Sequence, residues 1–163
     1  GGTWVGTKAG LVRLHGGEVE RLWGTVEGLF DGEVRAVVAS SRGAVWVASG
    51  LNTAKRGVQQ IVDDELVTIA YGDDVGRGVS ALWHDVDGTV WAGVRDSKQG
   101  NLLQILSSGK VRYHGEKAGL SGEGVHSIFR DRDRTLWIGM EDGALIGWWR
   151  DGKVRIDAEH GFS

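Results

Sequence analysis

An all-β fold made of repeated small antiparallel sheets is predicted by a recurring tryptophan motif and by the distribution of glycine. The motif is a tryptophan among aliphatic or β-branched residues, with glycine or alanine two positions later, and it occurs at residues 3–6, 45–48, 90–93 and 136–139. The four tryptophans are 42, 45 and 46 residues apart. This period is typical of a β-propeller, in which each repeat is one small sheet called a blade.

Glycine supports the same fold class. The chain has 28 glycines among 163 residues and no proline, and the glycines are spread over turn positions. Many short strands joined by tight turns use glycine in this way. No stretch sustains apolar residues at the spacing i, i+3, i+4, i+7, so no helix is predicted.

The second repeat defines four strands, A to D, and the other repeats follow it. Its strands are predicted at residues 34–39, 44–49, 57–62 and 66–70. The third repeat gives 79–83, 89–94, 101–106 and 110–113. The fourth gives 125–129, 135–140, 144–149 and 154–157. The first repeat lacks strand A and gives 3–6, 11–15 and 19–22.

These strands predict one partial blade and three blades of four antiparallel strands, at residues 1–30, 31–75, 76–118 and 119–163. Residues 159–163 resemble the loop 27–31 that precedes a strand A. Propellers close with about 4–8 blades, and stacked repeats need their end faces covered. We therefore expect these blades to be part of a ring of seven or eight, completed by the remaining blades of a parent propeller or by a second copy of the chain. A closed ring of four is the less favoured alternative.

Packing between blades explains the apolar strands and the recurring tryptophans. Because blades stack face to face, strands A and B are expected to be buried on both faces. Each tryptophan is expected to fill the wedge between two neighbouring sheets, and an aromatic ligand cage is the alternative.

The turns before the tryptophans are rich in aspartate, as at residues 85–88 and 131–134. Aspartate followed by glycine is typical of a tight hairpin turn. The Asp-x-Asp-Gly segment also resembles the start of a calcium loop, but the bidentate glutamate of such a loop is missing. The chain has no cysteine. We therefore predict no metal site and no cofactor.

Charge and hydropathy limit the partners. The formal net charge is −3, from 19 basic and 22 acidic residues that form no block of one sign. A nucleic-acid-binding protein would normally show a basic patch, so no nucleic acid is expected. No apolar stretch reaches the roughly 18 residues that span a bilayer, so this segment is not expected to contact a membrane.

Residues 27–38, 118–131 and 135–139 together resemble the two-component regulator propeller repeat, and residues 9–14 fit the glycine-leucine segment that follows its tryptophan motif. The proline usual in the glycine-leucine loop is absent. The resemblance implies a sensory, extracytoplasmic (periplasmic) propeller of a bacterial signalling protein that responds to a small molecule or an oligosaccharide. It also implies a histidine kinase or diguanylate cyclase domain outside this chain, because neither has a signature here.

Ligand-binding candidates lie in the two long loops that follow strand B. In a propeller these loops share one face with the loops that precede strand A, and function concentrates in such loops. Their cationic and amide side chains could hold an anionic or hydroxyl-rich ligand. Ordinary solvated surface charge is the alternative. The candidates are Asn52, Lys55, Arg56, Arg95, Lys98 and Gln99.

Catalysis is not expected. The five histidines lack metal-binding spacing, although His84 and His126 could face the central funnel around which blades are arranged. A propeller enzyme, such as a polysaccharide lyase or glycosidase, is the alternative to a ligand sensor, and a structural scaffold is the third possibility. An enzyme would use these histidines or a carboxylate pair from the same loops, whose separation the sequence does not give. The candidate carboxylates are Asp31, Glu33, Asp73, Asp74 and Glu123.

Overall fold

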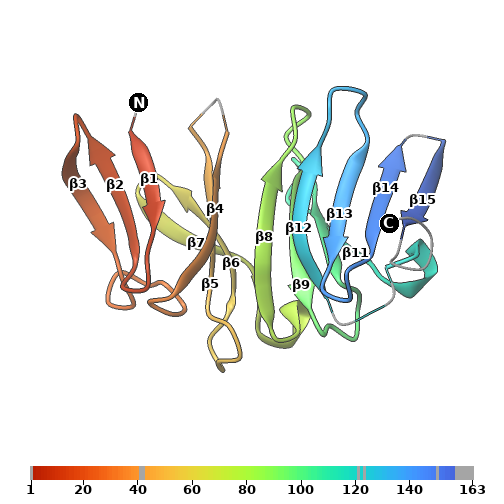
Figure 1. The fold of residues 1–163 in the computed structure, drawn as a ribbon. Helices are drawn as coiled ribbons and strands as arrows, with labels where there is room; N and C mark the ends of the chain where they lie inside the picture. The colour runs from red at the N-terminus through yellow and green to blue at the C-terminus, as the bar shows by residue number, and fades with distance from the viewer. Residues whose placement is uncertain (1, 41–42, 121, 123, 150, 157–163) are drawn as a thin grey trace.

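The chain forms four antiparallel sheets that lie side by side, with the first and last sheets at opposite ends (Figure 1). This computed structural model describes residues 2–40, 43–120, 122, 124–149 and 151–156. One sheet has three strands and three sheets have four, and within each sheet every strand pairs with the next in sequence. The predicted all-β, propeller-type architecture with a first blade that lacks strand A is therefore confirmed.

The strands agree closely with the predicted ones. The first blade contains β1 (Thr3–Gly6), β2 (Leu11–His15) and β3 (Glu18–Trp23). The second contains β4 (Val34–Ala39), β5 (Val45–Ser49), β6 (Gly57–Val62) and β7 (Glu65–Tyr71). The third contains β8 (Gly78–His84), β9 (Val90–Arg95), β10 (Leu102–Ile105) and β11 (Val111–His114). The fourth contains β12 (Val125–Arg130), β13 (Leu136–Met140), β14 (Leu145–Trp149) and β15 (Gly152–Ile156). The predicted end of the fourth blade, residues 157–163, lies outside the described residues.

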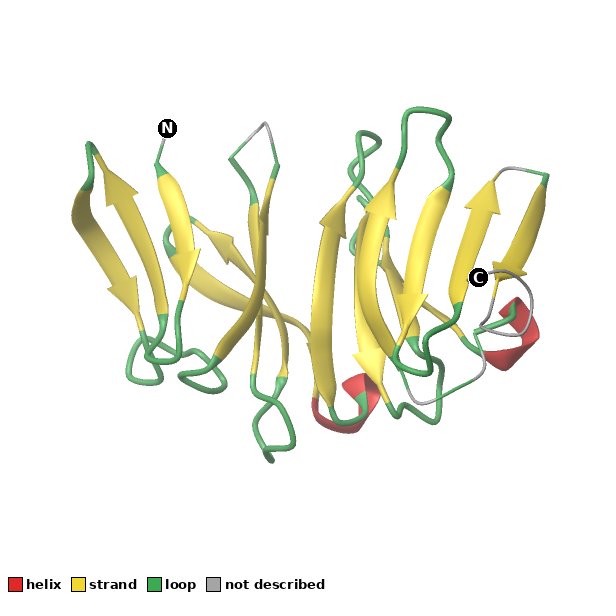
Figure 2. Ribbon diagram, in the orientation of Figure 1, coloured by secondary structure: helices red, strands yellow, loops and turns green. Residues whose placement is uncertain are grey.

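Two short 3₁₀ helices were not predicted. They are η1 (Gly72–Val75) and η2 (Glu116–Ala118), and each lies in the loop that joins strand D to the next strand A (Figure 2). A single turn is too short to show helical periodicity in the sequence. Within the described ranges no helix is long and apolar enough to cross a lipid bilayer.

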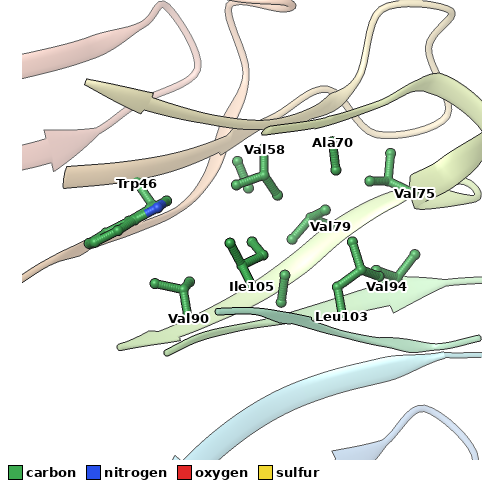
Figure 3. Packing of buried hydrophobic residues seen from close by; sticks show 11 residues of the cluster. Trp46, Val58, Ala70, Val75, Val79, Val90, Val94, Leu103 and Ile105 are labelled. Atoms are coloured by element: carbon green, nitrogen blue, oxygen red, sulfur yellow. The ribbon is translucent and has the colours of Figure 1, made fainter. Parts of the chain in front are cut away.

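The apolar core is divided between the contacts of successive blades. Trp46 of β5 belongs to a cluster with Val90 and Leu103 of the third blade (Figure 3). Trp91 of β9 lies in the next cluster with Ile138 of the fourth blade. Trp4 of β1 packs in the same way against a cluster of the second blade. The predicted role of these three tryptophans in packing between blades is therefore confirmed.

The expectation that strand A is buried on both faces is wrong. Strand B is buried along its length in β5 and over residues 90–94 of β9. In contrast, no residue of β4 is fully buried, β8 is fully buried only at Gly78 and Val79, and three of the six residues of β12 are exposed. The reason is topological: strand A is the edge strand of each four-stranded sheet, so one of its sides has no neighbouring strand.

The aspartates of the turns between strands A and B anchor the tryptophans. Asp85 accepts a hydrogen bond of 3.1 Å from the indole Nε1 of Trp91, and Asp131 accepts one of 2.7 Å from Trp137. In both cases the aspartate precedes the tryptophan by six residues. The bond from Trp137, together with that from the Thr135 amide, lowers the pKa of Asp131. The first aspartate of each of these two turns therefore holds the indole of the tryptophan that follows it.

Arginine–carboxylate pairs join neighbouring blades at the outer strands. Arg13 of β2 and Arg21 of β3 both bind Asp64, in the turn between β6 and β7, at 2.7 and 2.9 Å. The hydrogen bond from Arg13 lowers the pKa of Asp64. Trp23 donates to the Asp64 backbone carbonyl at 3.0 Å, so the first and second blades are held by polar as well as apolar contacts.

His114 makes the stability of the fold depend on pH. Its ring lies 5.8 Å from the Trp91 ring and 5.4 Å from the Trp148 ring, and burial, helped by the charge of Arg112, lowers its pKa. The unfolded chain therefore takes up this proton at a higher pH than the folded one. The stability gained by keeping His114 uncharged is complete above the ordinary histidine pKa of about 6.5. It falls, by at most about 1.4 kcal/mol per pH unit, as the pH drops toward the pKa of His114 in the folded state.

Urea unfolding at a series of pH values between 7.5 and 5 checks this expectation. His114→Phe should lose less stability on acidification than the wild type, because a phenyl ring keeps the aromatic contacts and carries no proton. His15→Asn is the control, because it removes a histidine at an exposed position. Parallel curves for His114→Phe and the wild type would contradict the assignment.

Candidate functional site

The loops that follow strand B and those that precede strand A lie at the same end of the sheets, at the bottom of Figure 1. We call this end the loop face; its described loop residues are 7–10, 24–33, 50–56, 72–77, 96–101, 115–120, 122, 124 and 141–144. Backbone hydrogen bonds join these loops from blade to blade. The amide of Val34 bonds to the carbonyl of Thr7 at 2.9 Å, and that of Asn52 to Arg77 at 2.8 Å. These bonds give the loop face a defined backbone.

The loop 50–56 uses part of its predicted ligand-binding set for its own structure. The Arg56 guanidinium donates to the carbonyl of Gly76, to that of Thr53 at 2.5 Å and to the Asp73 carboxylate at 3.2 Å. Lys55 is exposed, and its ammonium group has no partner among the described residues. Arg56 therefore fixes the loop, and Lys55 is free to contact a ligand.

Asn52 holds an arginine that sequence reasoning missed. Its side-chain oxygen accepts a hydrogen bond of 2.7 Å from Nε of Arg77, which immediately precedes β8. The Arg77 guanidinium is exposed and has no acidic partner within the described ranges. Asn52 itself has a φ of 57°, a conformation that asparagine tolerates better than most residues. Its role is therefore to orient Arg77.

The loop 96–101 divides its candidates between two places. Arg95, the last residue of β9, forms an ion pair of 2.5 Å with Glu141 of the fourth blade. Gln99 donates from its amide to Asp74 at 2.8 Å, across to the loop of η1. Lys98 is exposed and has no partner in the described part of the chain.

Two adjoining pockets are built around the Arg95–Glu141 pair. One of about 200 Å³ is lined by Arg77, Arg95, Asp96 and Glu141. The other, of about 460 Å³, is lined by Arg95, His126, Met140 and Glu141. The side chains come from the inner strands of the third and fourth blades and from the loops beside them. Both cations and acceptors therefore converge where the two blades meet on the loop face.

A third pocket, of about 360 Å³, lies farther along the same loops, and its polar lining includes Lys98, Gln99, Asn101 and Glu116. The Asn101 side chain is buried and donates to the Gly122 carbonyl at 2.9 Å. The six predicted residues are thus not one cluster. Arg95 lies in the first group of pockets, and Lys98 and Gln99 line the third pocket. Asn52 acts through Arg77, Arg56 closes its own loop, and Lys55 projects alone.

The carboxylates considered for catalysis are engaged separately. The Asp31 side chain accepts from the amide of Glu33, and Glu33 in turn binds Arg35 at 2.8 Å. Asp73 and Asp74 accept from Arg56 and Gln99. Within the described residues no hydrogen bond joins any two of these four carboxylates, and Glu123 lies outside those residues.

The two candidate histidines lie in different surroundings. His84 packs on Trp46, with ring centroids 5.2 Å apart, near the turn between strands A and B at the opposite end from the loop face. His84 therefore fills space between blades, which favours a structural role for it over a role at the funnel. His126 is exposed on β12 and lines the larger pocket beside Glu141.

Glu141 and Arg77 were missed because neither lies in the two long loops that follow strand B. Glu141 is the fourth residue after Trp137, as Arg95 is the fourth after Trp91, so aligning the repeats on their tryptophans would have brought both to one position. Position in the repeat is thus a better guide to this site than loop length.

Comparison with known proteins supports the propeller fold and identifies a match to one repeat of a known family. Residues 119–142 match the family model described as "Two component regulator propeller". No curated protein sequence matches the chain.

Solved propeller structures are similar in fold. The extracellular domain assigned to the hybrid two component system BT4673 of B. thetaiotaomicron superposes with a TM-score of 0.74 at 17% identity, over 96% of this chain and 20% of that one. The corresponding domain of BT3049 gives 0.52 at 15% identity, over 99% and 27% of the two chains. A virginiamycin B lyase of Staphylococcus aureus gives 0.55 at 15% identity, over 78% and 42%.

The chain spans about a fifth of the length of the BT4673 domain, and at these identities the similarity shows the fold alone. The sequence resemblance noted above is confirmed by the match of residues 119–142. The fold is that of propeller blades, and residues 119–142 of its fourth blade match the two-component regulator propeller model.

Proposed function

We propose that this chain is the ligand-sensing propeller portion of a bacterial extracytoplasmic signalling receptor of the two-component type. The observation that carries the proposal is the convergence of Arg77, Arg95, Glu141 and His126 on two adjoining pockets of the loop face. The match of residues 119–142 and the fold shared with extracellular domains of B. thetaiotaomicron signalling systems support the periplasmic setting.

The chemistry of the pockets suits a small polar molecule or an oligosaccharide. Arginine presents several N–H donors in a planar fork that matches a carboxylate or a pair of hydroxyl oxygens. Arg77 is held by Asn52 through Nε, and its terminal nitrogens are left for a ligand. Glu141 and His126 add acceptors and a further donor on the neighbouring blade. A hydroxyl-rich ligand, with or without an acidic group, fits this arrangement.

A propeller lyase or glycosidase is the second candidate, because His126 and Glu141 line the same pocket. We favour binding over catalysis because Glu141 is already engaged. Its carboxylate is paired with Arg95 at 2.5 Å, is only 15% exposed and helps to join the third and fourth blades. On this proposal the enzymatic output of the receptor belongs to a domain outside this chain.

Calorimetric titration with neutral and acidic oligosaccharides tests the binding site. For a ligand that binds, Arg77→Ala should raise the dissociation constant by about 10-fold or more, because a hydrogen bond to a charged group contributes about 1.5–3 kcal/mol. Lys110→Ala is the matched control: Lys110 is an exposed cation in the turn between β10 and β11, away from the loop face. The proposed site is wrong if Arg77→Ala and Lys110→Ala bind equally well.

A further inference from the structure

The third and fourth blades meet at a polar group whose members come from two repeats. Asp85, six residues before Trp91, accepts a hydrogen bond from the Trp91 indole and binds Arg130 of the fourth blade at 2.6 Å. Arg130 is the last residue of β12 and precedes Trp137 by seven residues. One carboxylate therefore serves a buried indole N–H and a guanidinium at the contact between these blades.

The second and third blades meet at the equivalent place without either of these charged residues. Ser40 precedes Trp46 by six residues, as Asp85 precedes its tryptophan, and His84, the last residue of β8, occupies the position of Arg130. The turn itself is unchanged. The backbone amide of Ser40 bonds to the carbonyl four residues later at 2.8 Å, and the same bond closes the turn of the third blade. The carboxylate and the guanidinium are therefore replaced on an unaltered backbone.

A pocket of about 520 Å³ lies beside Ser40 and His84, at the end of the sheets opposite to the loop face. Both of its walls are formed by four-stranded blades of this chain, the second and the third. Its volume is within the range of about 300–1,000 Å³ that is usual for small-molecule sites. The smaller side chains of this repeat thus coincide with a space that a small ligand can fill.

Two donors that line this pocket have no acceptor in the described part of the chain. Trp46 lies at one edge of the apolar cluster between the two blades and is only 8% exposed (Figure 3). Its Nε1 forms no hydrogen bond there, and it is not sealed from solvent as Nε1 of Trp83 is. Gln60 is the cross-strand neighbour of Trp46, and its amide is also without a partner. Buried donors need acceptors, so an oxygen-bearing ligand suits this pocket.

Asp87 adds one negative charge to the pocket. It is the only acidic side chain in the described lining, which contains no lysine or arginine. Its carboxylate is exposed and accepts a hydrogen bond of 2.9 Å from the amide of Thr89, and this bond lowers the pKa of Asp87. The carboxylate repels a simple anion and attracts an ammonium group. A ligand that carries both an acidic and a basic group therefore suits the donors and Asp87 together.

We propose that this pocket binds a free amino acid, with its carboxylate on Trp46 and Gln60 and its ammonium group toward Asp87. The ligand carboxylate takes the place that the Asp85 side chain has at the next contact between blades. The pocket lies at the opposite end of the sheets from Arg77. It is therefore a site separate from the one on the loop face, and it does not depend on the ligand proposed there.

Proton–nitrogen correlation NMR of the tryptophan indoles tests the site, with the common free amino acids as probes. The chain has eight tryptophans, and Trp46→Phe identifies the indole signal of Trp46. At least one amino acid should shift this signal to saturation, and more than any other indole signal. Its amide, which lacks the carboxylate, and its N-acetyl derivative, which lacks the ammonium group, should each bind about 10-fold or more weakly, because each loses a charged partner.

Ser40→Asp should close the site by supplying the carboxylate that the other repeats have. The Trp46 indole proton should move downfield, as a hydrogen-bonded proton does, and binding should weaken by about 10-fold or more. Ser108→Asp is the matched control, because Ser108 is exposed and outside the pocket lining and should leave binding nearly unchanged. Gln60→Glu is a second variant of nearly the same shape, and its carboxylate should repel that of the ligand.

The proposal is overturned if no amino acid shifts the Trp46 signal, or if the two derivatives bind as well as the parent compound. It is also overturned if Ser40→Asp or Gln60→Glu binds like the wild type. Arg77→Ala should leave this binding unchanged. Loss of binding in Arg77→Ala with no change in Gln60→Glu would place the amino acid on the loop face and would contradict the proposal.

Discussion

Trp91→Ala is expected to lower the free energy of unfolding by about 3–5 kcal/mol, the cost usually found for removing a large buried aromatic side chain. Trp91 is 7% exposed and lies in the cluster between the third and fourth blades. Its ring contacts His114 and Trp148, and its Nε1 donates to Asp85. Alanine would open a cavity between two sheets and remove one of the hydrogen bonds to a buried carboxylate.

Urea unfolding followed by far-UV circular dichroism measures this change without relying on tryptophan fluorescence. The matched control is Trp149→Ala, since Trp149 is 45% exposed on the last blade and its loss should cost less than about 1 kcal/mol. Similar losses for the two variants would show that Trp91 does not hold the blades together.

Asp85→Ala is the second substitution with a large expected effect, again a loss of about 3–5 kcal/mol, as for breaking a buried ion pair from one side. The Asp85 carboxylate is 8% exposed and binds Nε of Arg130 at 2.7 Å and a terminal nitrogen of the same guanidinium at 2.6 Å. It also accepts from Trp91. Without this carboxylate, the guanidinium of Arg130 and the indole N–H of Trp91 would each lose a hydrogen-bond acceptor at the contact between the third and fourth blades.

A thermodynamic cycle with Arg130→Met separates the ion pair from the rest of this effect. The double variant should be much less destabilised than the sum of the two single variants, because a methionine needs no acceptor. Asp133→Ala, in the equivalent turn of the fourth blade, is the control: its carboxylate is exposed and its loss should change stability by about 0.5 kcal/mol or less. Additive single effects would mean that Asp85 and Arg130 are not coupled.

The same two blades are thus joined by charge at both ends of their contact. Asp85 and Arg130 meet near the turns between strands A and B, and Arg95 and Glu141 meet at the loop face. The apolar cluster of Trp91 lies between these blades. A ligand that contacts Arg95 or Glu141 therefore touches the contact between blades and not a single loop.

The strands could be predicted closely because their signals are local and repeated four times. Trp46, for example, is flanked by valines and follows a turn, and its environment in β5 follows from the same pattern seen at Trp91. The partial burial of β4 could not be predicted, because six mostly apolar residues look the same in a central and in an edge strand. Whether a strand has one neighbour or two is decided by the sheet.

The site was less predictable because its residues come from separate repeats. Lys98 and Gln99 were predicted as ligand-binding candidates from the length of their loop, and both line a pocket. Arg56 is likewise a polar residue of a long loop after strand B, yet its guanidinium donates hydrogen bonds to the carbonyls of Thr53 and Gly76. Sequence spacing does not show which cation finds an acceptor within its own loop.

The sequence by itself determined the class of fold, the number of strands, the missing strand of the first blade and the tryptophan contacts between blades. These follow from residue type and period, which act over a few neighbouring positions. The tertiary structure alone decided that Arg77 and Arg95 share a pocket with Glu141, and that Arg56 and Asn52 are engaged by the loop that precedes β8. Those features depend on how one blade is placed against the next, and that placement results from packing and charge summed over whole sheets.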